Sequence, residues 1–83
     1  MTRIELAESL DRAEANSAPP PSLFGSMYRG CAQVCREAKT DRAAATALRR
    51  MVGPRKADEP MVASIPRTAA AILDGKRKPG GWL

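Results

Sequence analysis

The chain has 83 residues, of which 43% are hydrophobic, and a formal net charge of +5. This length predicts one small domain, near the lower end of what folds alone. No apolar run approaches the roughly 20 residues of a membrane-spanning helix, and the N-terminus lacks the order of a signal peptide, so we expect a cytoplasmic protein that does not enter a membrane.

The charge is distributed unevenly along the chain. Residues 1–15 contain two Arg against four Asp or Glu, a balance of −2, whereas the remainder contains twelve Lys or Arg against five Asp or Glu, a balance of +7. A basic body favours an anionic partner, which is either nucleic acid or an acidic protein surface. The alternative is a solvated basic surface without a dedicated partner.

Residues 2–15 are predicted to form an amphipathic helix. Thr2 and Glu5 have the spacing of a capping box at its start. Its apolar stripe consists of Ile4, Leu6, Leu10 and Ala13. The stripe is narrow, so we expect this helix to dock on the body of the protein or on a second copy, which leaves a homodimer open.

Residues 16–22 contain three consecutive prolines, which favour an extended and semi-rigid spacer. The single domain, residues 1–83, is therefore divided into an N-terminal helix (1–15), a Pro-rich spacer (16–22) and a helical body (23–83).

The strongest helical periodicity follows Ser22, which suits the N-cap of a core helix. Its apolar positions are Phe24, Met27, Tyr28, Cys31, Val34, Cys35 and Ala38. The predicted core consists of the first six of these residues together with Leu48 and Val52. Cys31 and Cys35 are interpreted as reduced core thiols, because the chain has no His and no third Cys to complete a metal site.

A further helix is predicted over residues 41–52, capped by Thr40 or Asp41 and ended by Gly53 and Pro54. Its apolar residues keep the helical spacing of the apolar residues in the preceding helix, so one long bent helix is the alternative. Its exposed side carries Arg42, Arg49 and Arg50.

Residues 54–63 are predicted to be a polar connection. Asp58 is expected to cap a single helical turn, with Met61 and Val62 packing inward. Because the residue before a proline avoids the helical region, two short helices are expected to meet at residues 64–66.

The last predicted helix has Pro66 in its first turn and an apolar face of Ile65, Ala69, Ile72 and Leu73. Gly75 stands where a left-handed C-cap belongs. Three consecutive cations, Lys76, Arg77 and Lys78, follow it at the negative end of the helix dipole.

Residues 67–79, which read R-T-A-A-A-I-L-D-G-K-R-K-P, resemble the recognition helix and following turn of Cro/repressor-type helix-turn-helix proteins. The resemblance implies that residues around Arg67 and Thr68 enter the major groove and that the basic turn holds phosphates. Residues 59–64 differ from the Ala and Gly that the family has in the preceding helix.

Trp82 is an aromatic residue that could stack on a base or fill a pocket on a protein partner; the alternative is that it covers the core of its own chain. The predicted binding residues are Arg67, Thr68, Lys76, Arg77, Lys78, Trp82, Arg49 and Arg50.

Catalysis finds no support in the sequence, because there is no His for acid–base chemistry and no Gly-rich phosphate loop. We expect no bound metal and no cofactor.

The sequence predicts a small all-α bundle of three to four helices that acts as a binding protein. The favoured function is a phage- or mobile-element-type regulator of nucleic acid or of a nucleic-acid-handling complex. The alternatives are a phage-type inhibitor, similar in size to anti-CRISPR proteins, or an adaptor on a host protein complex, and a structural subunit of a larger assembly.

Overall fold

The computed structural model describes residues 1–17 and 22–79. Over these residues the elements are α1 (Arg3–Ala15), α2 (Leu23–Glu37), α3 (Asp41–Val52), the 3-10 helix η1 (Met61–Ala63) and α4 (Ser64–Leu73). The predicted all-α bundle of three to four helices is therefore confirmed. The three prolines of the predicted spacer lie outside the described residues.

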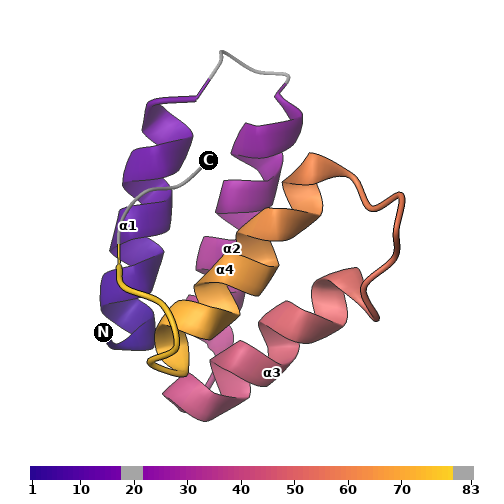
Figure 1. Ribbon diagram of the computed structural model, residues 1–83. Coiled ribbons are helices and arrows are strands. Elements are labelled where there is room, and N and C mark those ends of the chain that lie inside the picture. Colours follow the sequence, from indigo (N-terminus) through magenta and orange to yellow (C-terminus); the bar gives the residue numbers. More distant parts are fainter. Residues whose placement is uncertain (18–21, 80–83) are drawn as a thin grey trace.

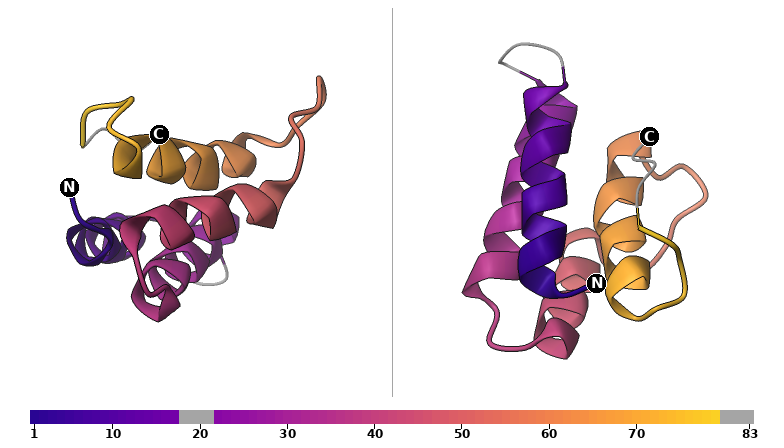
Figure 2. Two further views of the ribbon diagram at one scale, coloured as in Figure 1. Left: turned by 90° about the horizontal axis from the view of Figure 1, so that it is seen from below. Right: turned by 90° about the vertical axis from the view of Figure 1, so that its left-hand side faces the viewer.

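The helices form two antiparallel pairs, in which α1 lies against α2 and α3 lies against α4 (Figure 1). In the left view of Figure 2, α4 lies above the other three helices, and it contacts α2 as well as α3. α4 ends beside the N-terminus (Figure 1).

The start of α1 follows the predicted capping box. The Thr2 hydroxyl accepts a hydrogen bond from the Glu5 N–H at 3.2 Å, and the Glu5 carboxylate accepts one from the Thr2 N–H at 2.9 Å. The helix buries Leu6 and Leu10, but Ile4 is 44% exposed, so its place in the predicted stripe is wrong. Two residues along a helix are about 200° apart, which turns Ile4 away from the face that Leu6 occupies.

Arg3 fastens α1 to the corner between α2 and α3. Its Nη1 donates to the Cys35 carbonyl oxygen at 3.1 Å, and its backbone N–H donates to the Asp41 carboxylate at 2.8 Å. The Cys35 carbonyl belongs to the last turn of α2, where carbonyl groups have no partner within the helix. Arg3 therefore satisfies an acceptor that the end of α2 leaves open.

α2 and α3 are separate helices, so the alternative of one long bent helix is wrong. Ala38 has an extended backbone with φ −68° and ψ 148°, and the Thr40 hydroxyl then caps α3 by accepting from the Ala43 N–H at 3.0 Å. α3 ends at Gly53, whose φ of +66° places its backbone in a region that favours glycine. Because α3 has its own N-cap and C-cap, it is a helix separate from α2.

Half of the predicted core is fully buried. Tyr28, Cys31, Cys35 and Leu48 are at most 4% exposed. The other four predicted residues, Phe24, Met27, Val34 and Val52, are only partly buried. The remaining large core side chains come from α1 and α4, namely Leu6, Leu10, Ile65 and Ile72. Buried Ala residues on α3 and α4 allow these two helices to approach closely.

The segment before α4 differs from its prediction. Pro60 is the N-cap of η1 and no side chain caps it, so the predicted role of Asp58 as a cap is wrong. Val62 is buried as expected, but Met61 is 70% exposed and does not pack inward. η1 continues directly into α4, whose first turn accommodates Pro66 because the missing N–H has no acceptor there.

Candidate nucleic-acid interface

The turn after α4 follows from a C-capping motif. Gly75 has φ +74°; its N–H donates to the Ile72 carbonyl at 3.1 Å, and the Lys76 N–H donates to the Ala71 carbonyl at 2.9 Å. These two bonds are those of a Schellman motif, so the predicted left-handed cap is confirmed. The chain then leaves the helix with Lys76, Arg77 and Lys78 exposed.

Arg49 joins α3 to this turn. Its guanidinium forms an ion pair with the carboxylate of Asp74, the C-cap residue of α4. Arg42 lies seven residues earlier on α3, on the same side of the helix, and is exposed. The flank of α3 that faces α4 therefore adjoins the basic turn. We call Arg42, Arg49, Lys76, Arg77 and Lys78 the basic face.

Arg67 has a different environment from the other predicted binding residues. Its Nε donates to the Glu59 carboxylate at 2.9 Å, and its Nη2 donates to the Gly53 carbonyl at 3.0 Å and to Glu59. The side chains of Arg67 and Glu59 are 18% and 17% exposed. The hydrogen bond lowers the pKa of Glu59 and raises that of Arg67. Arg67 thus ties the segment between α3 and η1 to the beginning of α4.

The structure brings together only part of the predicted site. Arg49 adjoins the turn of Lys76 to Lys78, whereas Arg67 lies about 9 Å along the axis from the end of α4. Thr68, the neighbour of Arg67, is partly buried. Arg50 is exposed on the outer side of α3, and Trp82 lies outside the described residues. Sequence reasoning missed the Arg49–Asp74 pair, for which no local pattern exists.

The net charge differs between the half of the chain that forms the first helix pair and the half that forms the second. Residues 1–38 contain four Lys or Arg and five Asp or Glu, a balance of −1, whereas residues 39–83 contain ten and four, a balance of +6. In the first pair, Arg29 and Arg36 of α2 are neutralised by Glu14 and Asp11 of α1. The uneven charge of the sequence therefore becomes one nearly neutral pair of helices and one basic pair.

The approach to α4 differs from that of a helix-turn-helix unit, in which a short turn separates two helices. η1 is a single turn that joins α4 directly, and eight residues separate α3 from η1. All ten residues of α4 are buried or partly buried. The resemblance to Cro/repressor-type proteins accordingly stays a prediction from residues 67–79, and the basic face does not depend on it.

Comparison with known protein families, curated proteins and solved structures finds no match to this chain. Within residues 1–17 and 22–79, no helix is both long and apolar enough to cross a membrane. Over the same residues, no three His, Cys, Asp or Glu side chains are grouped so that they could hold a metal ion.

Cys31 and Cys35 lie in the core as predicted. Burial raises the pKa of the Cys31 thiol to about 12 and that of the Cys35 thiol to about 11.

Proposed function

We propose that the protein binds nucleic acid through phosphate contacts made by the basic face, as a regulator of the phage or mobile-element type. The observation that carries this proposal is the separation of charge: residues 39–83, which include α3, α4 and the turn after α4, have a balance of +6, with three exposed consecutive cations at the end of α4. Clustered Lys and Arg side chains supply most of the affinity of non-specific nucleic-acid binding, because they replace counterions on the phosphates.

The local geometry supports phosphate contact by the turn after α4. The carbonyls at the end of α4 already accept hydrogen bonds from the N–H groups of Gly75 and Lys76, so the cationic side chains are not required to satisfy them. Asp74, the nearest acid in the chain, binds Arg49. Lys76, Arg77 and Lys78 have no ion-pair partner among the described residues, which leaves their charges available to a ligand. The buried thiols suit the reducing cytoplasm, where we expect this binding to occur.

The test is a titration of short fluorescein-labelled DNA duplex and RNA, followed by fluorescence anisotropy over a range of salt concentrations. The variant Lys76→Gln, Arg77→Gln and Lys78→Gln removes three cations from the basic face. If all three contact phosphates, the slope of log Kd against log salt for duplex DNA should fall by roughly 3, at about 0.9 per contact.

A matched control removes the same charge elsewhere. Arg12→Gln, Arg55→Gln and Lys56→Gln together change three exposed cations of α1 and of the segment before η1. The control should keep most of the affinity, and circular dichroism should show that both triple variants remain helical. Equal weakening by the two variants would mean that binding follows net charge alone, and unchanged binding by the first variant would place the site elsewhere.

A further inference from the structure

A carboxylate, that of Asp74, lies within the basic face. It forms an ion pair with the Arg49 guanidinium, and the side chains of Asp74 and Arg49 are 25% and 49% exposed, so solvent reaches both members of the pair. Asp74 is the C-cap of α4, and the three cations Lys76, Arg77 and Lys78 follow it after Gly75. A ligand that approaches the turn after α4 therefore meets this carboxylate together with the cations.

The position of Asp74 is unfavourable for α4 by itself. The C-terminus of a helix is the negative end of the helix dipole, where cations are stabilising and a carboxylate is repelled. The Arg49 guanidinium, which comes from the last turn of α3, compensates this repulsion. An acid that helix stability does not favour, placed among cations, is the kind of local conflict that occurs at functional sites.

The other acids in the basic half of the chain are engaged elsewhere or lie apart. Asp41 accepts a hydrogen bond from the Arg3 N–H, and Glu59 binds Arg67. Asp58 is exposed in the segment before η1. Among the described residues, the pair of Arg49 and Asp74 is the one ion pair that includes a cation of the basic face.

Arg49 is able to exchange its carboxylate partner for a phosphate. A guanidinium donates two parallel hydrogen bonds to a carboxylate or to a phosphate, so both groups suit the same side chain. An ion pair between partly exposed side chains contributes little to stability, because water solvates both ions when they separate. After the exchange, however, the released carboxylate of Asp74 stays beside the bound phosphate and repels it.

We propose that Asp74 is an autoinhibitory acid of the basic face: it holds Arg49 in the free protein and weakens nucleic-acid binding, because a phosphate has to displace it. This inference rests on the proposed function, since it concerns the same surface. Without the carboxylate, Arg49 is available to a phosphate from the start, and nothing repels the phosphate that it binds.

The variant Asp74→Asn tests this inference in the anisotropy titration with fluorescein-labelled duplex DNA. Asn is accepted at helix ends, so circular dichroism should show that the variant remains helical. We expect its Kd to fall by about three- to fivefold, the upper part of the range for an exposed ion pair. The slope of log Kd against log salt should rise by about 0.9, the value for one further phosphate contact.

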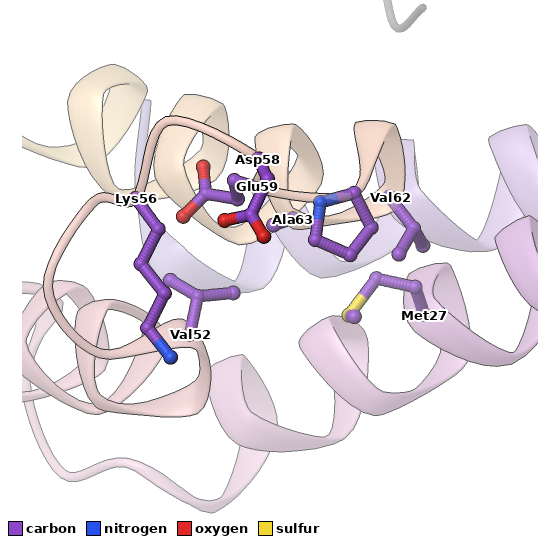
Figure 3. A pocket seen from close by; sticks show the side chains of 8 residues that line it. Met27, Val52, Lys56, Asp58, Glu59, Val62 and Ala63 are labelled. Carbon is purple, nitrogen blue, oxygen red and sulfur yellow. The ribbon is translucent and has the colours of Figure 1, made fainter.

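Asp58→Asn is the matched control, because it removes one exposed carboxylate and changes the net charge equally. Asp58 lines a hollow of about 400 Å³ together with Met27, Val52 and Val62, before η1 (Figure 3). Asp74 lies at the opposite end of α4, which spans about 15 Å, whereas the Debye length at physiological salt is about 8 Å. The control should therefore change Kd by less than about twofold.

The same substitution in an Arg49→Gln background separates partner exchange from a general loss of negative charge. There, Asp74→Asn should tighten binding by a smaller factor than in the wild type, because no ion pair has to be broken. The proposal would be overturned by unchanged or weaker binding of Asp74→Asn, by equal effects of the two Asn variants, or by an equal gain with and without Arg49. If the wild type still binds through Lys76, Arg77 and Lys78, those outcomes leave the proposed function intact, whereas a wild type that does not bind would overturn both.

Discussion

One chemical change, glycine to alanine, should have opposite effects at two positions of this protein. Gly30 lies inside α2, where an added methyl group would meet the Met51 Cε at 3.6 Å, an ordinary contact. Gly53 ends α3 with φ +66° and ψ −163°, and nothing lies within 4 Å of an added methyl group. The first substitution therefore tests helix propensity, and the second tests backbone strain alone.

The structure sets the expected size of each effect. Ala is favoured over Gly within a helix by about 0.8–1.0 kcal/mol, so Gly30→Ala should stabilise the protein by about that amount. The backbone angles of Gly53 lie in a region that is essentially restricted to glycine, so Gly53→Ala should cost about 1–3 kcal/mol. For a domain of this size, 1 kcal/mol shifts Tm by about 4–8 °C.

Thermal melts followed by circular dichroism, together with urea titrations, measure both effects. Gly53→Asn provides a control, because Asn tolerates the left-handed helical region but not the extended ψ observed at Gly53, and it should not restore the stability. A Gly30→Ala variant that melts below the wild type, or a Gly53→Ala variant that melts at or above it, would refute this reasoning.

Three other predictions concern the core and the titrating groups. Leu48→Ala, at a position with no exposure, should cost about 2.7–5 kcal/mol in urea titrations. Met51→Ala, on the same helix but 40% exposed, should cost much less, and equal costs would contradict the burial of Leu48. Burial raises the pKa of Cys31 to about 12 and of Cys35 to about 11, so both thiols should react with a disulfide reagent far more slowly in the folded than in the unfolded protein. The hydrogen bond from Arg67 lowers the pKa of Glu59 below 4.5. The ionised Glu59 carboxylate should therefore stabilise the folded protein above that pH, and this stabilisation should be lost as the pH falls through the lowered pKa. Glu59→Gln should therefore reduce the loss of stability on acidification, and an unchanged pH dependence would argue against this contribution.

The helices of this protein follow from short-range patterns in its sequence. The Thr2–Glu5 capping box, the Ser22 and Thr40 caps and the left-handed Gly75 all occur where the sequence predicts them. Each depends on residues within a few positions of one another, so the interactions that form them are present in the local chain. The all-α class and the exposed cations after α4 could be predicted for the same reason.

Contacts between residues far apart in the sequence could not be predicted from local patterns and were seen only in the tertiary structure. Helical periodicity identified an apolar face on α2, but Met27 and Val34 are only partly covered, because the extent of burial depends on how closely α3 packs against that face. Arg67 was predicted to face a ligand, whereas in the fold it binds Glu59 and the Gly53 carbonyl, fourteen residues earlier. A sequence pattern specifies which side chains share a helix face, but the relative placement of α2, α3 and α4 sets which faces meet and which charges are neutralised.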